Sequence, residues 1–199
     1  MRFLVCLFLL IVPARKIYRK FRSFRIIFRG VLSGSIHTSV RFDTVPIIKG
    51  HGTLEIGRGV RIGSDVIFNL GNSGHIALNE NCSIAQNCGI SVETQVLIGS
   101  GTRINRDCQL TGGIDIGKDC ILANGVNIIS TSHRFIPGIP IDIADQKYGL
   151  KVDKVVIDAN CFVGAHAILL GAINCGKSCI IGAKVKLQNV DVENGSLVK

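Results

Sequence analysis

The chain has 199 residues, enough for one domain with an appendage, and carries a formal net charge of +9. That charge is uneven, because 8 of the 23 basic residues and none of the 14 acidic residues fall within 1–30, which leaves 15 basic residues for the rest. A folded body so close to neutral lacks the basic face that nucleic-acid binding requires, so we expect no nucleic-acid partner.

Residues 1–34 form the first expected unit, a basic amphipathic segment. Its apolar run, residues 3–12, is shorter than the roughly 20 residues that a bilayer-spanning helix needs. After Pro13, apolar residues recur at helical spacing opposite Arg and Lys, a pattern typical of an interfacial anchor on anionic lipid. A helix that caps the folded body has the same pattern, so both interpretations stay open. We expect a cytoplasmic protein whose residues 1–30 can contact the inner face of the cytoplasmic membrane.

From residue 56 onward an apolar residue recurs every six positions. Of 18 such positions, 17 hold a large apolar residue and one holds Cys175. This period fits neither a helix nor a simple alternating strand, and it indicates a β-solenoid whose three-unit coils bury their apolar residues by stacking. Glycine often follows, which suits a tight corner where a side chain would crowd the backbone. The solenoid is expected over 35–199, with an irregular first coil over 35–55, where the six-residue register is poor.

Six of the eight cysteines fall four residues after a unit start, and this phase predicts small, inward-facing core residues. A disulfide framework or a zinc site would be a sharper interpretation, but the chain has no CxxC pair. We therefore expect packed free thiols and no metal site, which also suits a reducing cytoplasm. The six are Cys82, Cys88, Cys108, Cys120, Cys161 and Cys179.

An insertion of 23 residues separates the coil that starts at Ile116 from the coil that starts at Ile157. It occupies about residues 134–154, and a loop of this length is more often functional than decorative. His133 lies at its root, where the loop can cover it. Because histidine titrates near neutral pH, such a side chain can deprotonate a hydroxyl, although an exposed loop histidine is the plainer alternative.

Three stretches resemble the hexapeptide-repeat O-acetyltransferases, in particular the branch with the polysaccharide (O-antigen and capsule), galactoside and maltose acetyltransferases. They are residues 98–104 (IGSGTRI), 116–133 (IGKDCILANGVNIISTSH) and 157–185. The specific part is the Ser/Thr-x-x-His coil end, the loop, and the motif FVGAH at 162–166, where relatives usually begin with Trp. The chain lacks the Gly-x-Pro-Ala segment with which relatives usually continue.

The resemblance implies an all-β fold, a left-handed parallel β-helix solenoid. It also implies a homotrimer with acetyl-CoA as co-substrate in a groove between subunits, and no required metal. His133 matches the family's general base, and Asn105 matches an asparagine that contacts the acceptor sugar. The positions that match cofactor contacts or line the same groove are Ala165, His166, Gly182 and Ala183.

The expected function is acetyl-CoA-dependent O-acetylation of a sugar hydroxyl in a bacterial polysaccharide or its precursor, with direct attack assisted by the histidine. An N-acetyltransferase acting on an amino sugar and a catalytically degenerate scaffold stay open as alternatives. A γ-class carbonic anhydrase uses the same prism but needs three converging histidines with a His-x4-His pair, which the five histidines of this chain do not provide.

Overall fold

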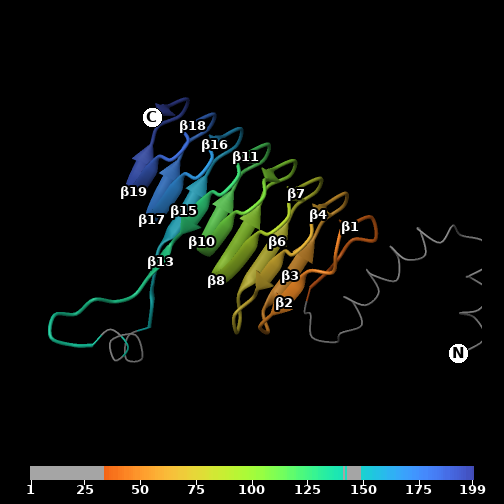
Figure 1. Ribbon diagram of the computed structural model, residues 1–199, viewed down its shortest axis with the longest axis horizontal. Helices are drawn as coiled ribbons and strands as arrows, with labels where there is room; N and C mark the ends of the chain where they lie inside the picture. Colours follow the sequence, from red (N-terminus) through yellow and green to blue (C-terminus); the bar gives the residue numbers. More distant parts are fainter. Residues whose placement is uncertain (1–33, 141, 143–148) are drawn as a thin grey trace, which may run out of the picture.

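The structure is a computed structural model that describes residues 34–140, 142 and 149–199 (Figure 1). The described chain winds about eight times around one axis, and its strands pair in parallel from coil to coil. This is the all-β, left-handed parallel β-helix expected from the sequence. The basic amphipathic segment expected over 1–34 lies outside the described residues except for Gly34. Within the described part of the chain, no helix is long and apolar enough to span a membrane.

One side of the prism, which we call face I, is an eight-stranded parallel sheet. Each of its strands has two residues, the first pointing outward and the second inward, so each coil presents one side chain on this face. The strands are β1 (Arg41–Phe42), β4 (Arg61–Ile62), β7 (Ser83–Ile84), β9 (Arg103–Ile104), β11 (Ile121–Leu122), β16 (Phe162–Val163), β18 (Ile180–Ile181) and β20 (Leu197–Val198).

The other two sides, faces II and III, belong to one ten-stranded sheet. Face II contains β2 (Ile47–Lys49), β5 (Ile67–Asn69) and β12 (Asn127–Ile129), and face III contains β3 (Thr53–Ile56), β6 (His75–Leu78) and β15 (Lys154–Ile157). Four longer strands run along face II and then turn onto face III. They are β8 (Gly89–Ile98), β10 (Gln109–Ile116), β17 (Ile168–Cys175) and β19 (Lys186–Val192).

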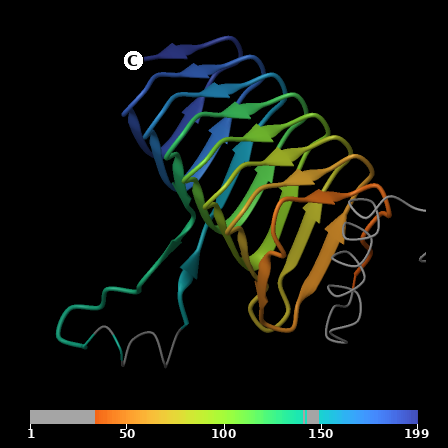
Figure 2. The ribbon, with the colours of Figure 1, turned by 45° about the vertical axis from the view of Figure 1, so that its right-hand side comes forward.

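The coils meet at three corners, which we name by the faces they join: III/I, I/II and II/III. A short antiparallel ribbon, β13 (Thr131–Ser132) with β14 (Lys151–Val152), leaves the prism at corner II/III. Figures 1 and 2 both show this ribbon projecting from an otherwise uninterrupted stack of coils. The one large projection from the stack in the described chain therefore begins beside His133.

The apolar residues that start each six-residue unit form the core. All 18 are buried, with exposed fractions of 8% or less, so the register read from the sequence is confirmed. The first coil is more regular than expected, because Arg41 pairs with Arg61 and Ile47 with Ile67. A six-residue series through Ile36, Phe42 and Ile48 precedes the one that begins at residue 56, and two extra residues between the series hide their continuity.

The buried cysteines confirm the expected phase and add a function for it. Their thiols donate hydrogen bonds to carbonyl oxygens at the corner of the following coil, for example from Cys82 to Gly99 and from Cys161 to Gly176, each at 3.0 Å. Thr102 occupies the same column and donates to Gly117 at 2.7 Å. A small side chain with one donor therefore fills the core and satisfies a corner carbonyl at the same time.

Glycine at the first corner position is required by close stacking, as expected. A β-carbon on Gly117 would lie 2.6 Å from the backbone nitrogen of Ala159 in the next coil. The left-handed backbone conformation occurs two residues later, where Asp119 has φ of 57°. Asn, Asp and Gly hold most such positions because they adopt this conformation at the lowest cost.

Candidate active site

His133 is exposed at the root of the projecting ribbon. Immediately after it, the Nε of Arg134 donates a hydrogen bond to the carbonyl oxygen of Gly149 at 3.0 Å. This contact joins the outgoing and returning chains just beyond the β13–β14 pairing. Backbone pairing before His133 and the side chain of Arg134 after it therefore hold the chain, while the side chain of His133 is exposed.

Ser130 anchors the ribbon to the prism, a role that the sequence reasoning did not assign. Its side chain is buried, and its Oγ accepts the backbone N–H of Gly113 at 2.7 Å. Its carbonyl oxygen accepts the N–H of Asp153 at 2.7 Å, where the chain returns to the coil. The sequence offered one indication of this role: Ser130 lies two residues after the buried unit start at Ile128 and shortly before the loop.

The four positions predicted to bind cofactor all lie at corner I/II in two successive coils. The carbonyl oxygen of Ala165 accepts the N–H of Lys184 at 2.8 Å, which stacks the two corners directly. The backbone N–H groups of Ala165 and Ala183 donate to no backbone acceptor within the described residues. Gly182 is half-buried and Ala183 is exposed, and both carry little side chain at this corner.

His166 lies at the same corner with a left-handed backbone, φ of 58°. Its imidazole occupies the space above Gly125, where a β-carbon would come into contact with Nδ1. The N–H of His166 donates to the carbonyl oxygen of Asn124 at 2.9 Å. The ring is thus placed beside the column of Ala165 and Ala183.

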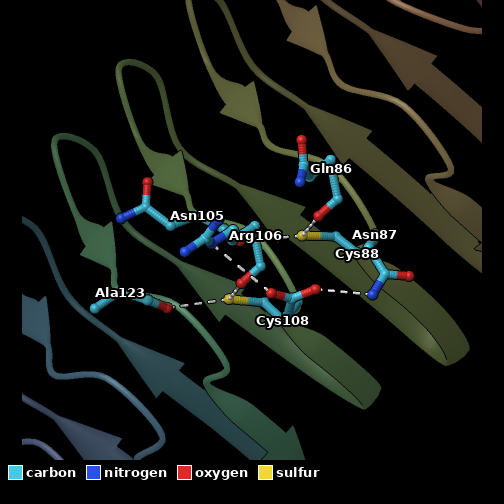
Figure 3. A network of polar contacts seen from close by, with 8 residues as sticks. Gln86, Asn87, Cys88, Asn105, Arg106, Cys108 and Ala123 are labelled. Atoms are coloured by element: carbon cyan, nitrogen blue, oxygen red, sulfur yellow. Dashed lines mark hydrogen bonds and ion pairs between the residues drawn. The ribbon is translucent and has the colours of Figure 1, made fainter.

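Asn105 lies at corner I/II as well, two coils before Ala165. Its backbone is fixed in the stack, because its N–H donates to Leu122 at 3.0 Å and its carbonyl oxygen accepts the thiol of Cys88 at 3.1 Å. Figure 3 shows its amide pointing away from the buried thiols, beside Arg106 on the outside of the corner. Its amide donors and acceptor therefore face the surface and not the core.

The structure brings the predicted residues together in two groups and not in one. Asn105 and the four cofactor positions share corner I/II, whereas His133 emerges at corner II/III, across the width of face II. One chain alone therefore does not place the candidate base beside the candidate cofactor positions.

Burial raises the pKa of the Cys82 and Cys120 thiols to about 11, so these side chains are protonated at neutral pH. Within the described residues, one group of three potential metal ligands lies close enough to share an ion: Cys161, Cys175 and Cys179. The sequence reasoning missed this group because it looked for CxxC spacing, and these residues come from two different coils. The sequence did offer one indication of this group, because Cys175 is a cysteine at a unit start, where every other unit has a large apolar residue.

Comparison with known proteins finds no matching family and no matching curated protein. Solved structures do match. A serine-to-alanine mutant of AntD, an N-acyltransferase from Bacillus cereus, in complex with dTDP-4-amino-4,6-dideoxyglucose and coenzyme A, has a TM-score of 0.55 at 19% identity, over 86% of this chain and 81% of that one. An aspartate-to-alanine mutant of AntD, in complex with dTDP and coenzyme A, has a TM-score of 0.50 at 19% identity, over 85% and 80%. The polySia-specific acetyltransferase NeuO has a TM-score of 0.44 at 18% identity, over 81% and 72%. At this identity the likeness shows a shared fold, the left-handed parallel β-helix.

Proposed function

We propose that the protein is an acetyl-CoA-dependent O-acetyltransferase that acetylates a sugar hydroxyl of a bacterial polysaccharide or its precursor. The observation that carries the proposal is His133, held and exposed at the root of the projecting ribbon of a β-helix. Further support comes from the N–H groups of Ala165 and Ala183, which donate to no backbone acceptor within the described residues, since peptide donors of this kind suit the amides of a pantetheine arm. The AntD neighbour, which binds coenzyme A, shares this fold.

In this proposal the working unit is a homotrimer. With corner III/I at the threefold axis, face I of one chain meets face III of the next, and their outer corners, I/II and II/III, become neighbours. His133 of one chain then lies beside the cofactor positions of another. Face I suits such contact, because its outward row carries exposed apolar side chains in the last coils, Phe162, Ile180 and Leu197.

His133 acts as the general base. Its imidazole accepts the proton of the acceptor hydroxyl while the hydroxyl oxygen attacks the thioester carbonyl of acetyl-CoA. The tetrahedral intermediate then expels the thiolate, and the imidazolium returns the proton to it. The products are the acetyl ester and free coenzyme A, so the protein ends the cycle unchanged. Asn105 hydrogen-bonds the acceptor, and Ala165, His166, Gly182 and Ala183 line the cofactor groove.

An N-acetyltransferase acting on an amino sugar is the second candidate, because the AntD neighbour is an N-acyltransferase in complex with an amino-sugar nucleotide. The two candidates differ in the acceptor atom alone. Product analysis with matched acceptors, one bearing a hydroxyl and one an amine at the same carbon, distinguishes them. Exclusive acetylation of the amine would replace the O-acetyltransferase by the alternative.

The base assignment is tested by His133→Ala in the full chain, with His51→Ala as the control. His51 is also exposed, but it lies in an early coil away from the loop. Loss of a general base should lower turnover by about 10²-fold or more and leave acetyl-CoA binding nearly intact. Turnover like that of the His51 variant would remove His133 from the mechanism.

Residues 1–30, which lie outside the described part of the chain, attach the trimer to the inner face of the cytoplasmic membrane in the same proposal. Their eight basic residues and absence of acids support this role. The full chain should co-sediment with vesicles that contain anionic lipid, and a chain without residues 1–30 should stay in the supernatant. If the shortened chain co-sediments as well as the full chain, residues 1–30 are not the membrane anchor, and the alternative role as a cap on the folded body is favoured.

A further inference from the structure

Three thiols converge in the core near the C-terminal end of the solenoid. The Sγ atoms of Cys161, Cys175 and Cys179 all lie within 4.8 Å of one another, and the three residues are at most 2% exposed. Cys161 belongs to one coil, and the other two belong to the next. They therefore link two coils close to the open end of the stack, where fewer neighbours stabilise each coil.

Cys175 departs from two rules that the rest of the chain follows. It holds the single unit-start position, among 18, that is not a large apolar residue. Its thiol also donates to no carbonyl oxygen within the described residues, whereas the thiols of the other six described cysteines each do. Packing alone does not explain a cysteine here, because the equivalent positions hold larger apolar residues, for example Ile157 in the coil before and Val192 in the coil after. Its neighbours are the other two sulfurs.

The arrangement suits a soft metal ion. Zinc–thiolate bonds of about 2.3 Å place the sulfurs of a three-sulfur site about 4 Å apart, so the observed spacing needs to contract by less than about 1 Å. The backbone N–H of Cys179 already points at the Sγ of Cys161 at 3.4 Å, and such a donor stabilises a metal-bound thiolate. Both features prepare the site for an ion.

Charge selects the class of ion. The buried polar side chains of the described chain are Thr102 and Ser130, so no buried cation compensates a negative site. A divalent ion that replaces three thiol protons releases them to solvent and leaves one net negative charge, whereas a monovalent ion leaves two. Because buried uncompensated charge is costly, the divalent ion is favoured.

We propose that Cys161, Cys175 and Cys179 bind one thiophilic divalent d¹⁰ cation, with Zn²⁺ as the physiological ion. The ion joins the last two complete coils and stabilises the C-terminal end of the stack. This site is separate from the candidate active site and does not depend on the acetyltransferase function.

The test is a titration of the full chain with Cd²⁺ under anaerobic, reduced conditions, in a Cys6→Ser background that removes the thiol outside the described residues. The sulfur-to-cadmium charge-transfer band in the ultraviolet should rise to one Cd²⁺ per chain, and Zn²⁺ should displace it. Cys175→Leu restores the apolar residue of other unit starts, and Cys179→Val matches Val60 in the same column. Both should lose the band and weaken binding by about 100-fold.

Two controls make the result specific. Cys82→Val and Cys88→Ala remove thiols outside the cluster and should leave the stoichiometry and the band unchanged. Cd²⁺ should also raise the melting temperature of the parent chain and not that of folded Cys175→Leu. Absence of the band in the parent chain, or its persistence in the Cys175→Leu and Cys179→Val variants, would overturn the proposal.

Discussion

The imidazole of His166 occupies the space that a β-carbon on Gly125 would fill. Gly125 lies one coil earlier at the same corner, with φ of 70°, and His166 itself has φ of 58°. The same relationship occurs at corner III/I, where a β-carbon on Gly101 would meet the Oδ1 of Asp119. The two pairs share backbone geometry and differ in location, so the same substitution in each pair separates an effect on the corner I/II site from a general loss of stability.

Gly125→Ala should weaken acetyl-CoA binding by about tenfold or more, because the added methyl group displaces a ring that lines the proposed groove. Gly101→Ala is the matched control, since it carries the same left-handed strain of about 1–2 kcal/mol. Titration calorimetry measures the affinities, and thermal melting measures the shared loss of stability. Equal affinities in the two variants would separate His166 from cofactor binding.

Ile180→Glu should dissociate the proposed homotrimer. Ile180 is 46% exposed at the centre of the apolar row of face I, between Phe162 and Leu197, and burying a carboxylate among apolar side chains is unfavourable. Ile47→Glu is the control, because Ile47 is 51% exposed on face II. Sedimentation velocity should give monomer for the first and trimer for the second. A trimeric Ile180→Glu would place the subunit contact on another face.

Thr102→Val should lower stability by about 2 kcal/mol, because it leaves a buried N–H and a partly buried carbonyl oxygen unpaired. The Oγ1 of Thr102 donates to the carbonyl oxygen of Gly117 at 2.7 Å and accepts the N–H of Cys120 at 3.0 Å. Thr102→Cys supplies the thiol donor that Cys82 uses in the same column, so its loss should be smaller. Urea unfolding at neutral pH compares the variants, and equal losses would show that the donor contributes nothing.

Stability should fall above about pH 9, because burial raises the pKa of Cys82 from 9.0 to about 11. Between these values the unfolded chain has lost a proton that the folded chain retains, so rising pH favours the unfolded state. Below about pH 9 both states keep the proton and the contribution is constant. Urea midpoints across this range under reducing conditions should show a shallower decline for Cys82→Val. Parallel declines would contradict the assignment.

The inward rows of the solenoid were predictable because they depend on local periodicity alone. Counting by sixes placed the core residues from Ile56 to Leu187 and the buried phase of the cysteines. It missed the regularity of the first coil, because two extra residues before Ile56 shift the count. Counting at a fixed period detects a repeat, but the count fails where a corner contains extra residues.

Contacts between coils could not be predicted in the same way. The thiol–carbonyl bonds, the anchor at Ser130 and the Cys161–Cys175–Cys179 group all join residues that become neighbours only when coils stack. The separation of His133 from Ala165 across face II also depends on the corner at which the loop leaves the prism. Both residues could be predicted as candidates from the sequence. In the proposed trimer, His133 lies beside Ala165 of a second chain.

The most direct measurement is a calorimetric titration of the purified, folded protein with acetyl-CoA. We predict saturable binding of one acetyl-CoA per chain, and we expect Ile180→Glu to abolish it because the proposed groove needs two subunits. An absence of binding to a trimer shown to be folded would contradict the proposed transferase function and remove the main support for His133 as its base.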